Sequence, residues 1–369
     1  MAIKDGLQPR ETSRTVRRWG WQLLGYAIAA GCLYWVFHNV PFAQVLRSIL
    51  RIDWWWVPLA AALDLLVYAC AAWEWQLLLK PAGHLSFGQT LKALLAGRFA
   101  NDVLPVHAGY IIRVYLASAW TKATIAEVLP SLLIERLFDS FWLALGIGLT
   151  AFFFPLPSKL ARTGEILGGF IVAGVAMITW TTFRKRKPRS TQRPARFSHS
   201  KTVLRLHSFL QRLAQGLRSI GRSNLILAAL GLSIIKLIIQ CLAFLALLHA
   251  YALQFSLWTQ LAVFIIAYIG ISMPSTPAGI GVFQLLCVAG LRFFGVPKPV
   301  ASGFALLAYV VLTLPLAIAG LIAVTQSGLT LRSIRRQISQ WKRPSPILSQ
   351  VRKNAQVGEK SVDTTSPLW

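Results

Sequence analysis

The sequence predicts an all-α fold: a polytopic transmembrane helical bundle of about eight spans with one or two re-entrant or broken segments. Two observations predict it. The chain has 369 residues, 55% of them hydrophobic, yet it carries a formal net charge of +26. The apolar residues gather in runs close to the roughly 20 residues that cross the hydrocarbon layer, and the charge gathers between those runs. A water-soluble core does not separate the two properties in this way.

The aromatic and cysteine residues agree with a membrane location. Tryptophans lie near the ends of apolar runs, where indole rings prefer the membrane interface. The clearest examples are Trp19, Trp21, Trp35, Trp54 to Trp56, Trp120 and Trp258. The cysteines Cys32, Cys70, Cys241 and Cys287 all sit inside apolar runs without paired spacing, so we expect neither a disulfide framework nor a metal site. No basic domain or motif for nucleic acid lies between the runs, and we expect no nucleic-acid partner.

Basic segments predict the orientation of the chain. Lys and Arg concentrate in residues 1–18, in the loop 184–223 and in the tail 327–369, whose end is expected to be disordered. All three are expected in the cytoplasm of a cell with an inner membrane, so N- and C-termini are both cytoplasmic. The transmembrane domain is then 19–326, and an even number of crossings separates neighbouring basic segments. An uncleaved first span is favoured over a signal peptide because no small-residue cleavage pattern follows it.

In the first half, apolar runs predict spans near 19–38, 54–79, 124–154 and 166–183. A fifth crossing would break the parity, so residues 85–120 are predicted to form a re-entrant or interfacial hairpin from the cytoplasmic side. This segment is interrupted by Asn101, Pro105 and Gly109, and it carries Arg98, Asp102 and Arg113. Broken helices at membrane depth need protein or water around their backbone, and they often mark a transport site.

In the second half, spans are predicted near 224–250, 256–273 and 299–326. One further crossing is needed, and the run from Ala278 to Val296 can supply it as a short helix. Alternatively, 256–296 forms one deep hairpin without a crossing. The total is eight spans, or six spans and two hairpins.

Charged residues inside apolar runs are the candidate functional residues, because each costs at least about 2.5–3.5 kcal/mol at the centre of a span. Glu135 and Asp139 share one helix face, and Arg136 lies about 100° round the helix. Arg98 or Arg113 of the hairpin are the expected cationic partners. Two interpretations stay open: an ion-pair network that fixes the hairpin, and a polar cavity that admits a charged headgroup.

Three further charged residues lie in apolar runs. Glu74 stands between Trp73 and Trp75, and we expect it to reach the interface. Asp64, nearer the centre of the second span, is the better functional candidate. Lys236 is expected to be a cavity residue or a partner for one of the acids.

The segment from Pro274 to Gly281 cannot continue a straight helix, because it contains two prolines and two glycines. The helix that follows would present N–H groups and its positive dipole end, which suit a phosphate. A purely structural kink is the alternative. The candidate residues here are Ser275, Thr276, Pro277, Gly279, Gly281 and Gln284.

The sequence offers little for catalysis. It contains no nucleotide-binding glycine loop, no nucleophile elbow and no histidines at zinc-ligand spacing. We therefore expect no catalytic residues and no cofactor, and we do not expect an enzyme.

Three motifs together resemble a known family, the membrane region of the lysylphosphatidylglycerol synthases, also called the flippase-like domain. They are the stretch from Asn101 to Gly109 followed by Arg113, the stretch from Glu135 to Asp139, and the stretch from Pro274 to Val282. The resemblance covers most of residues 20–326 and implies a polytopic bundle with re-entrant segments. In multiple-peptide-resistance proteins a similar region moves an aminoacylated phospholipid outward, and a soluble transferase domain follows it. Here the chain stops within about 40 residues of the last predicted span, so synthase activity is expected to be absent.

This chain also departs from the family pattern. His107 and Tyr110 stand where the family often has a basic residue and an acid, and Gln284 stands where an acid is common. These differences bear on the substrate that the resemblance implies.

Three functions are therefore carried forward. The leading one is a lipid flippase, passive or ion-coupled, that acts on membrane lipids with anionic or modified headgroups. In that case Arg98, Arg113, Arg136 and the helix end after Pro277 hold the headgroup, and Glu135 and Asp139 line its path. The second is a membrane-embedded transferase that uses Asp64, Asp102 or Asp139 as a general base. The third is a non-catalytic scaffold for a separately encoded lipid or glycan synthase, and a homo-oligomer is compatible with each.

Overall fold

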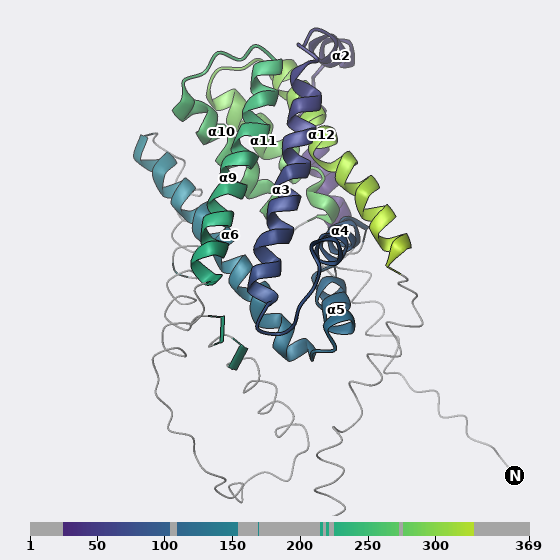
Figure 1. Ribbon diagram of the computed structural model, residues 1–369. Helices are drawn as coiled ribbons and strands as arrows, with labels where there is room; N and C mark the ends of the chain where they lie inside the picture. Colours follow the sequence, from purple (N-terminus) through teal and green to yellow (C-terminus); the bar gives the residue numbers. More distant parts are fainter. Residues whose placement is uncertain are drawn as a thin grey trace, which may run out of the picture. The chain divides into compact units, whose positions relative to one another are not determined.

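The computed structural model describes residues 25–103, 109–153, 169, 215–216, 219–220, 225–272 and 276–327. Every regular element within these residues is a helix, which confirms the all-α class (Figure 1). Apart from the last three described residues, all of them belong to one compact unit, Met1–Val324. The first half contains a helix over Gly25–Phe37, α2 (Phe42–Leu50), α3 (Trp56–Leu79), α4 (Phe87–Val103), α5 (Gly109–Thr121) and α6 (Ile125–Phe153). The second half contains α9 (Leu225–Ala250), α10 (Leu257–Ser272), the 3-10 turn η1 (Pro277–Gly279), α11 (Val282–Phe293) and α12 (Lys298–Gln326).

The long helices fit a membrane bundle. By length and composition, α3, α9 and α12 can each cross a bilayer, and Gly25–Phe37, Leu257–Ile271 and Val282–Phe293 are shorter apolar helices. The 29 residues of α6 are also long enough, although α6 carries several charges. Predicted spans at 54–79, 124–154, 224–250, 256–273 and 299–326 coincide with α3, α6, α9, α10 and α12. The predicted span at 166–183, apart from Gly169, and the start of the one at 19–38 lie outside the described residues.

Helix α2 was not predicted from the sequence, because its nine residues are too short to form a span. Val45 is buried against the rest of the protein. Phe42, Leu46 and Leu50, which follow one another at four-residue intervals, are all exposed. The helix therefore carries an apolar stripe on its outer face.

The segment 85–120 contains two helices, α4 and α5, that pack against each other. A side chain at Gly109 would overlap the carbonyl oxygen of Gly97, so glycine is required for the two helices to approach this closely. The Asn101 side chain accepts a hydrogen bond from the Gly109 N–H at 2.7 Å and caps the start of α5. Residues 104–108, which contain Pro105 of the predicted break, lie outside the described residues, and re-entry from the cytoplasmic side stays a prediction.

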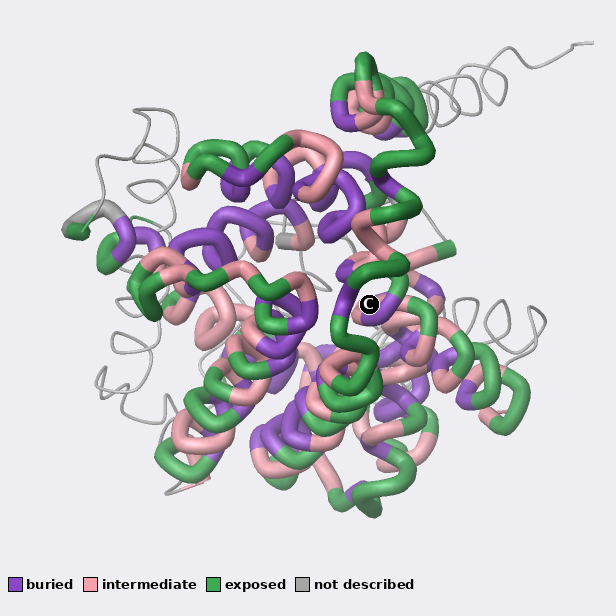
Figure 2. Tube along the Cα trace, turned by 90° about the horizontal axis from the view of Figure 1, so that it is seen from above, coloured by how far each residue is buried: buried purple, intermediate pink, exposed green. Residues whose placement is uncertain are grey.

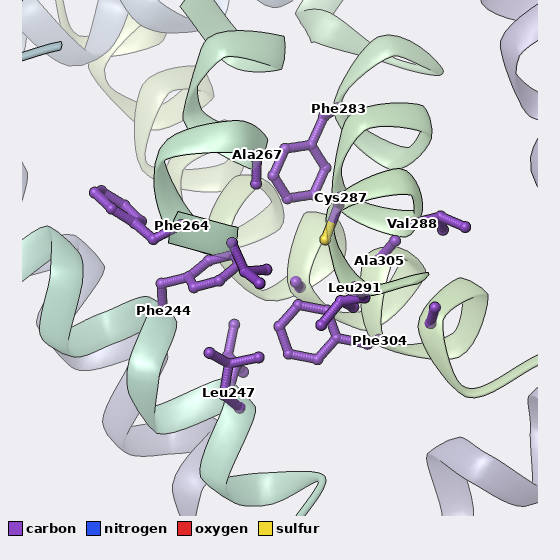
Figure 3. Packing of buried hydrophobic residues seen from close by; sticks show 14 of the residues in the cluster. Phe244, Leu247, Phe264, Ala267, Phe283, Cys287, Val288, Leu291, Phe304 and Ala305 are labelled. Carbon is purple, nitrogen blue, oxygen red and sulfur yellow. The ribbon is translucent and has the colours of Figure 1, made fainter. Parts of the chain in front are cut away.

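A continuous apolar core joins α9, α10, α11 and α12 (Figure 3). Phe244 of α9 packs edge-on against Phe264 of α10 and Phe304 of α12, with ring centroids 5.6 and 5.4 Å apart. Phe283 and Cys287 of α11 complete the cluster. Exposed residues follow the outer sides of the helices of the bundle (Figure 2), as expected for helices that face lipid.

The predicted break before α11 is present. Ala278, Gly279 and Gly281 have φ values of 55°, 72° and 85°, all in the left-handed region. A Cβ at Gly281 would lie 2.6 Å from the carbonyl oxygen of Ala29, so the break also lets the helix Gly25–Phe37 pass close by. The kink thus has a packing role.

Candidate functional site

A cavity of about 400 Å³ lies among α3, α4, α5, α6, α9 and α10, beside the break before α11. Its charged lining residues are Arg98, Asp102, Arg113, Glu135, Arg136, Asp139 and Lys236. These side chains come from α4, α5 and α6, which follow one another in the sequence, and from the distant α9. The fold therefore gathers most of the buried charge of the described residues around one space.

Arg113 and Glu135 form the most buried ion pair of this cavity. Two guanidinium nitrogens of Arg113 each donate to one carboxylate oxygen of Glu135, Nη1 to Oε1 at 2.9 Å. The Arg113 guanidinium also lies 3.9 Å from the ring centre of Trp75, whose indole N–H donates to the Ser131 hydroxyl at 3.0 Å. The predicted link between the hairpin and α6 is present, and it ties α5 to α6 and α3.

Lys236 of α9 binds two acids at once. Its ammonium group is 2.7 Å from Glu74 of α3 and 2.8 Å from Asp139 of α6. This confirms Lys236 as a partner of the acids and corrects the interpretation of Glu74. Glu74 does not reach the interface: it is fully buried, because Lys236 offers a counter-ion inside the bundle.

Arg136 completes the network and is its most accessible member. It reaches Glu135 at 3.3 Å and Asp139 at 3.2 Å, and its guanidinium lies 4.6 Å from the Tyr110 ring centre. Its side chain is 43% exposed, whereas that of Lys236 is 11% and that of Arg113 is 4% exposed. Arg136 is therefore the cation of the network that is most accessible to solvent.

Arg98 and Asp102 form a separate pair on α4, at 3.5 Å. Arg98 also lines a second, smaller cavity together with Asp64 of α3. The two candidates that the sequence placed on different segments, Asp64 and Arg98, are thus brought close together.

The break before α11 contributes less than predicted. Gly279 lines the larger cavity, together with Ala278, whose carbonyl oxygen accepts a hydrogen bond from Tyr309 at 3.1 Å. Of the residues whose side chains the structure describes, Thr276, Gly281 and Gln284 do not line the cavity, and the side chain of Pro277 lies outside that description. The Gly281 N–H donates to the Gln284 side chain at 2.7 Å, so the start of α11 is partly capped by the protein and does not offer all its N–H groups to a ligand.

Nine of the predicted site residues therefore meet at one cavity, and Asp64 lies beside it. They are Arg98, Asn101, Asp102, Arg113, Glu135, Arg136, Asp139, Lys236 and Gly279. Pro105 and Ser275 lie outside the described residues. Sequence reasoning missed the polar lining residues Tyr68, Ser140, Gln240 and Tyr268, and it named Tyr110 only as a departure from the family pattern. The available signal was spacing, because Tyr68 is four residues from Asp64 and Gln240 is four residues from Lys236, which puts each pair on one helix face.

A helical membrane bundle with a charged internal cavity defines a class: polytopic membrane proteins with ionisable residues inside the bundle. Residues 22–320 match the family described as the lysylphosphatidylglycerol synthase TM region, and the chain belongs to this family. It is also similar to a UPF0104 membrane protein of Methanothermobacter thermautotrophicus, with 24% identity over 279 residues, covering 72% of this chain and 81% of that protein. Both comparisons agree with a membrane location and with the resemblance that the three motifs carried.

Proposed function

We propose that this protein translocates a phospholipid or lipid-linked headgroup across the bilayer, and that the headgroup passes through the charged cavity. The observation that carries the proposal is the set of charged residues around one cavity of about 400 Å³ among apolar helices. Each such charge costs free energy within the hydrocarbon region, and charged groups there usually mark the path of a polar substrate. Membership of a lipid-related membrane family supports the same proposal.

Arg136 is the residue that receives the headgroup in this proposal. It is the most exposed cation of the network, and its Nε, although buried, has no hydrogen-bond partner among the described residues. A guanidinium binds phosphate through paired, charge-assisted hydrogen bonds. A phosphate that reaches Arg136 competes with Glu135 and Asp139 for the same nitrogens, so binding rearranges existing ion pairs instead of filling an empty charged site.

The exposed fractions divide the network into two functional parts. Arg113, Glu135, Glu74 and Lys236 are buried, and they hold α3, α5, α6 and α9 together. Arg136 and Asp139, which line the same cavity, are more exposed, at 43% and 19%. In the proposed cycle the buried pairs keep the helices in place while the exposed residues exchange partners with the headgroup. No covalent step is assigned to the cavity, so the protein acts as a passive or ion-coupled transporter and not as an enzyme.

The experiment is headgroup-selective translocation by the purified protein in liposomes. Fluorescently labelled anionic, aminoacylated and glycosylated lipids are placed in one leaflet, and their appearance in the other is followed over time. Wild type should move at least one class faster than protein-free liposomes, and Arg136→Ala should lose most of that movement.

The matched control is Arg292→Ala. Arg292 is an exposed residue of the last turn of α11 and does not line the cavity, so this variant should translocate like wild type. No movement of any lipid class by well-folded wild type would reject translocation and favour the scaffold function instead. Equal loss in both variants would show that the effect of Arg136→Ala is not specific to the cavity.

The proposal also places the protein in the cell inner membrane with both termini in the cytoplasm. The support is the basic character of residues 1–18, 184–223 and 327–369. Reporter fusions at these three segments test it, since an active periplasmic reporter at any of them would contradict the orientation. The expected partners are membrane lipids, and a separately encoded lipid or glycan biosynthetic enzyme is the partner that co-purification would reveal.

A further inference from the structure

A second cavity of about 50 Å³ adjoins the larger one, and it has room for one or two water molecules. Tyr68, Arg98, Gln240, Tyr268 and Ile271 line both cavities, so they form the boundary between the two spaces. Asp64 lines only the smaller cavity. The small cavity thus holds a carboxylate, and the large one holds the proposed headgroup path.

Asp64 is a buried carboxylate without full compensation. It is 6% exposed, and its Oδ2 has no hydrogen-bond partner within the described part of the chain. It lies eight residues after the start of α3, or about 12 Å along the helix, well inside a span. A charged carboxylate at this depth is costly unless a cation or a proton neutralises it.

The groups that face Asp64 come from all the helices around the small cavity. Helix α3 contributes Tyr68, α4 contributes Arg98, and α10 contributes Tyr268. Helix α9 contributes the neutral Gln240, and α12 contributes Thr313, whose hydroxyl donates to the Tyr309 carbonyl oxygen. Arg98 is therefore the cation that faces Asp64 among these residues.

Arg98 is shared between two carboxylates and two cavities. It pairs with Asp102 at 3.5 Å on the side of the larger cavity, and it faces Asp64 in the smaller one. An anionic headgroup that enters the larger cavity competes for this guanidinium. Asp64 then loses its compensating charge, and a proton is the species that restores neutrality. A metal cation fits poorly, because it needs several oxygen ligands and would be repelled by Arg98.

We propose that Asp64 is the coupling residue of this protein: it takes up one proton from cavity water when an anionic headgroup engages Arg98, and it returns that proton to water when the headgroup leaves. This inference rests on the proposed function and assigns its coupling ion. Because linkage is reciprocal, protons tighten headgroup binding by the factor by which the headgroup tightens proton binding.

The first test is the pH dependence of binding. Short-chain phosphatidylglycerol is titrated into the full-length protein in neutral detergent, in a pH series. For wild type, the Kd should fall on acidification by up to about tenfold per pH unit, the limit for one linked proton. The Kd of Asp64→Asn should not depend on pH over the same range.

Two further variants keep this test interpretable. Asp53→Asn makes the same chemical change just before α3, where Asp53 accepts a hydrogen bond from the exposed Trp55 N–H, and it should keep the wild-type slope. Arg98→Gln should bind phosphatidylglycerol more weakly, and its Kd should not depend on pH, because the headgroup then has no guanidinium through which it can affect Asp64. Three results would each overturn the inference: a Kd of Asp64→Asn that depends on pH as strongly as that of wild type, a wild-type Kd that does not depend on pH, or no binding of the probe by wild type.

The second test is transport in liposomes with an imposed pH gradient. Movement of phosphatidylglycerol from the acidic side should be several-fold faster than without the gradient in wild type and Asp53→Asn, and unchanged in Asp64→Asn. The two proposals fail separately. Lipid movement together with a Kd that does not depend on pH would support translocation and reject coupling through Asp64. A Kd that depends on pH together with no lipid movement would support the proton linkage and reject translocation.

Discussion

At the scale of single residues, the cavity is organised by a chain of ion pairs that runs from Arg113 through Glu135, Arg136, Asp139 and Lys236 to Glu74. Three cations alternate with three acids, so the chain is neutral as a whole. Neutrality makes the set tolerable inside the bundle, and it also makes each member hard to remove, because a deletion leaves a buried charge without a partner.

Lys236→Met tests this reasoning. The variant leaves Glu74 and Asp139 buried without their shared cation, and breaking a buried pair costs about 3–5 kcal/mol. We expect a large fall in thermal stability in detergent. Lys92→Met is the control, because Lys92 is exposed on α4 and should change stability by no more than about 0.5 kcal/mol. Equal stability of the two variants would contradict a structural role for the Lys236 network.

Arg136→Lys tests whether the guanidinium geometry of Arg136, the most exposed cation of the network, matters for lipid translocation. Arg136 reaches two carboxylates with different nitrogens, and a lysine has only one charged atom to offer. We expect lipid translocation to fall about tenfold, the equivalent of one lost charge-assisted hydrogen bond, and to stay above that of Arg136→Ala. A rate equal to wild type would show that only the charge of residue 136 is used.

The sequence predicted part of this residue-scale arrangement. The rule that charged residues in apolar runs are paired with opposite charges predicted two contacts correctly. It linked Arg113 to an acid of α6, and it gave Lys236 an acidic partner. The interpretation of Glu74 was wrong because two neighbouring tryptophans suggested an interface. Trp75 is instead fully buried. Tertiary packing decides which face of α3 contacts α9, and the spacing of residues within α3 does not reveal that face.

At the scale of elements, the α4–α5 pair positions Arg98, Asp102 and Arg113, and its geometry depends on the contact between Gly97 and Gly109. Asn101 links the two helices by accepting the hydrogen bond from Gly109. The two glycines therefore have a structural role: they let α4 and α5 approach closely beside the cavity.

Gly109→Ala should separate α4 from α5, because the new methyl group meets the backbone of Gly97 and the side chain of Asn101. Overpacking of this kind costs about 1–3 kcal/mol, so both thermal stability and lipid translocation should fall. Gly88→Ala is the control on α4, since a Cβ there has nothing within 4 Å, and it should leave stability unchanged or raise it by up to about 1 kcal/mol. If Gly109→Ala behaved like Gly88→Ala, the close approach would not matter.

Gln284→Ala tests the cap of α11. The variant removes the acceptor of the Gly281 N–H, and loss of a helix cap costs about 1 kcal/mol. Thermal stability should fall accordingly, whereas Gln284→Glu, which keeps an acceptor at the same place, should lose less. A greater loss in Gln284→Glu would mean that a negative charge is excluded from this buried position.

Element types were easier to predict than their contacts. The runs that became α3, α9 and α12 are apolar over a full span length, and length alone identified them. Helix α2 was missed because its stripe of Phe42, Leu46 and Leu50 is short and lies between two apolar runs. The free helix end expected after Pro277 was altered by Gln284, whose capping contact depends on local backbone geometry.

At the scale of the whole molecule, the compact unit combines two kinds of interior. Apolar packing around Phe244, Phe264, Phe283 and Phe304 joins α9 to α12, and the ion-pair network joins α3, α5, α6 and α9. Tyr68, Gln240 and Tyr268 lie where these interiors meet, between the two cavities. Sequence reasoning missed all three because isolated tyrosine and amide side chains in apolar runs resemble ordinary core residues.

The most direct test of the central claim is whether a lipid headgroup occupies the larger cavity. A single cysteine is placed at Ser140, a cavity-lining residue of α6, after Cys32, Cys70, Cys241 and Cys287 are replaced by alanine. A water-soluble thiol reagent is then applied to the protein in liposomes with and without the translocated lipid, and Ser256→Cys, at an exposed position before α10, reports on general access. The account predicts that Ser140→Cys is labelled and that the lipid slows this labelling but not that of Ser256→Cys. Labelling of Ser140→Cys that the lipid leaves unchanged would contradict it.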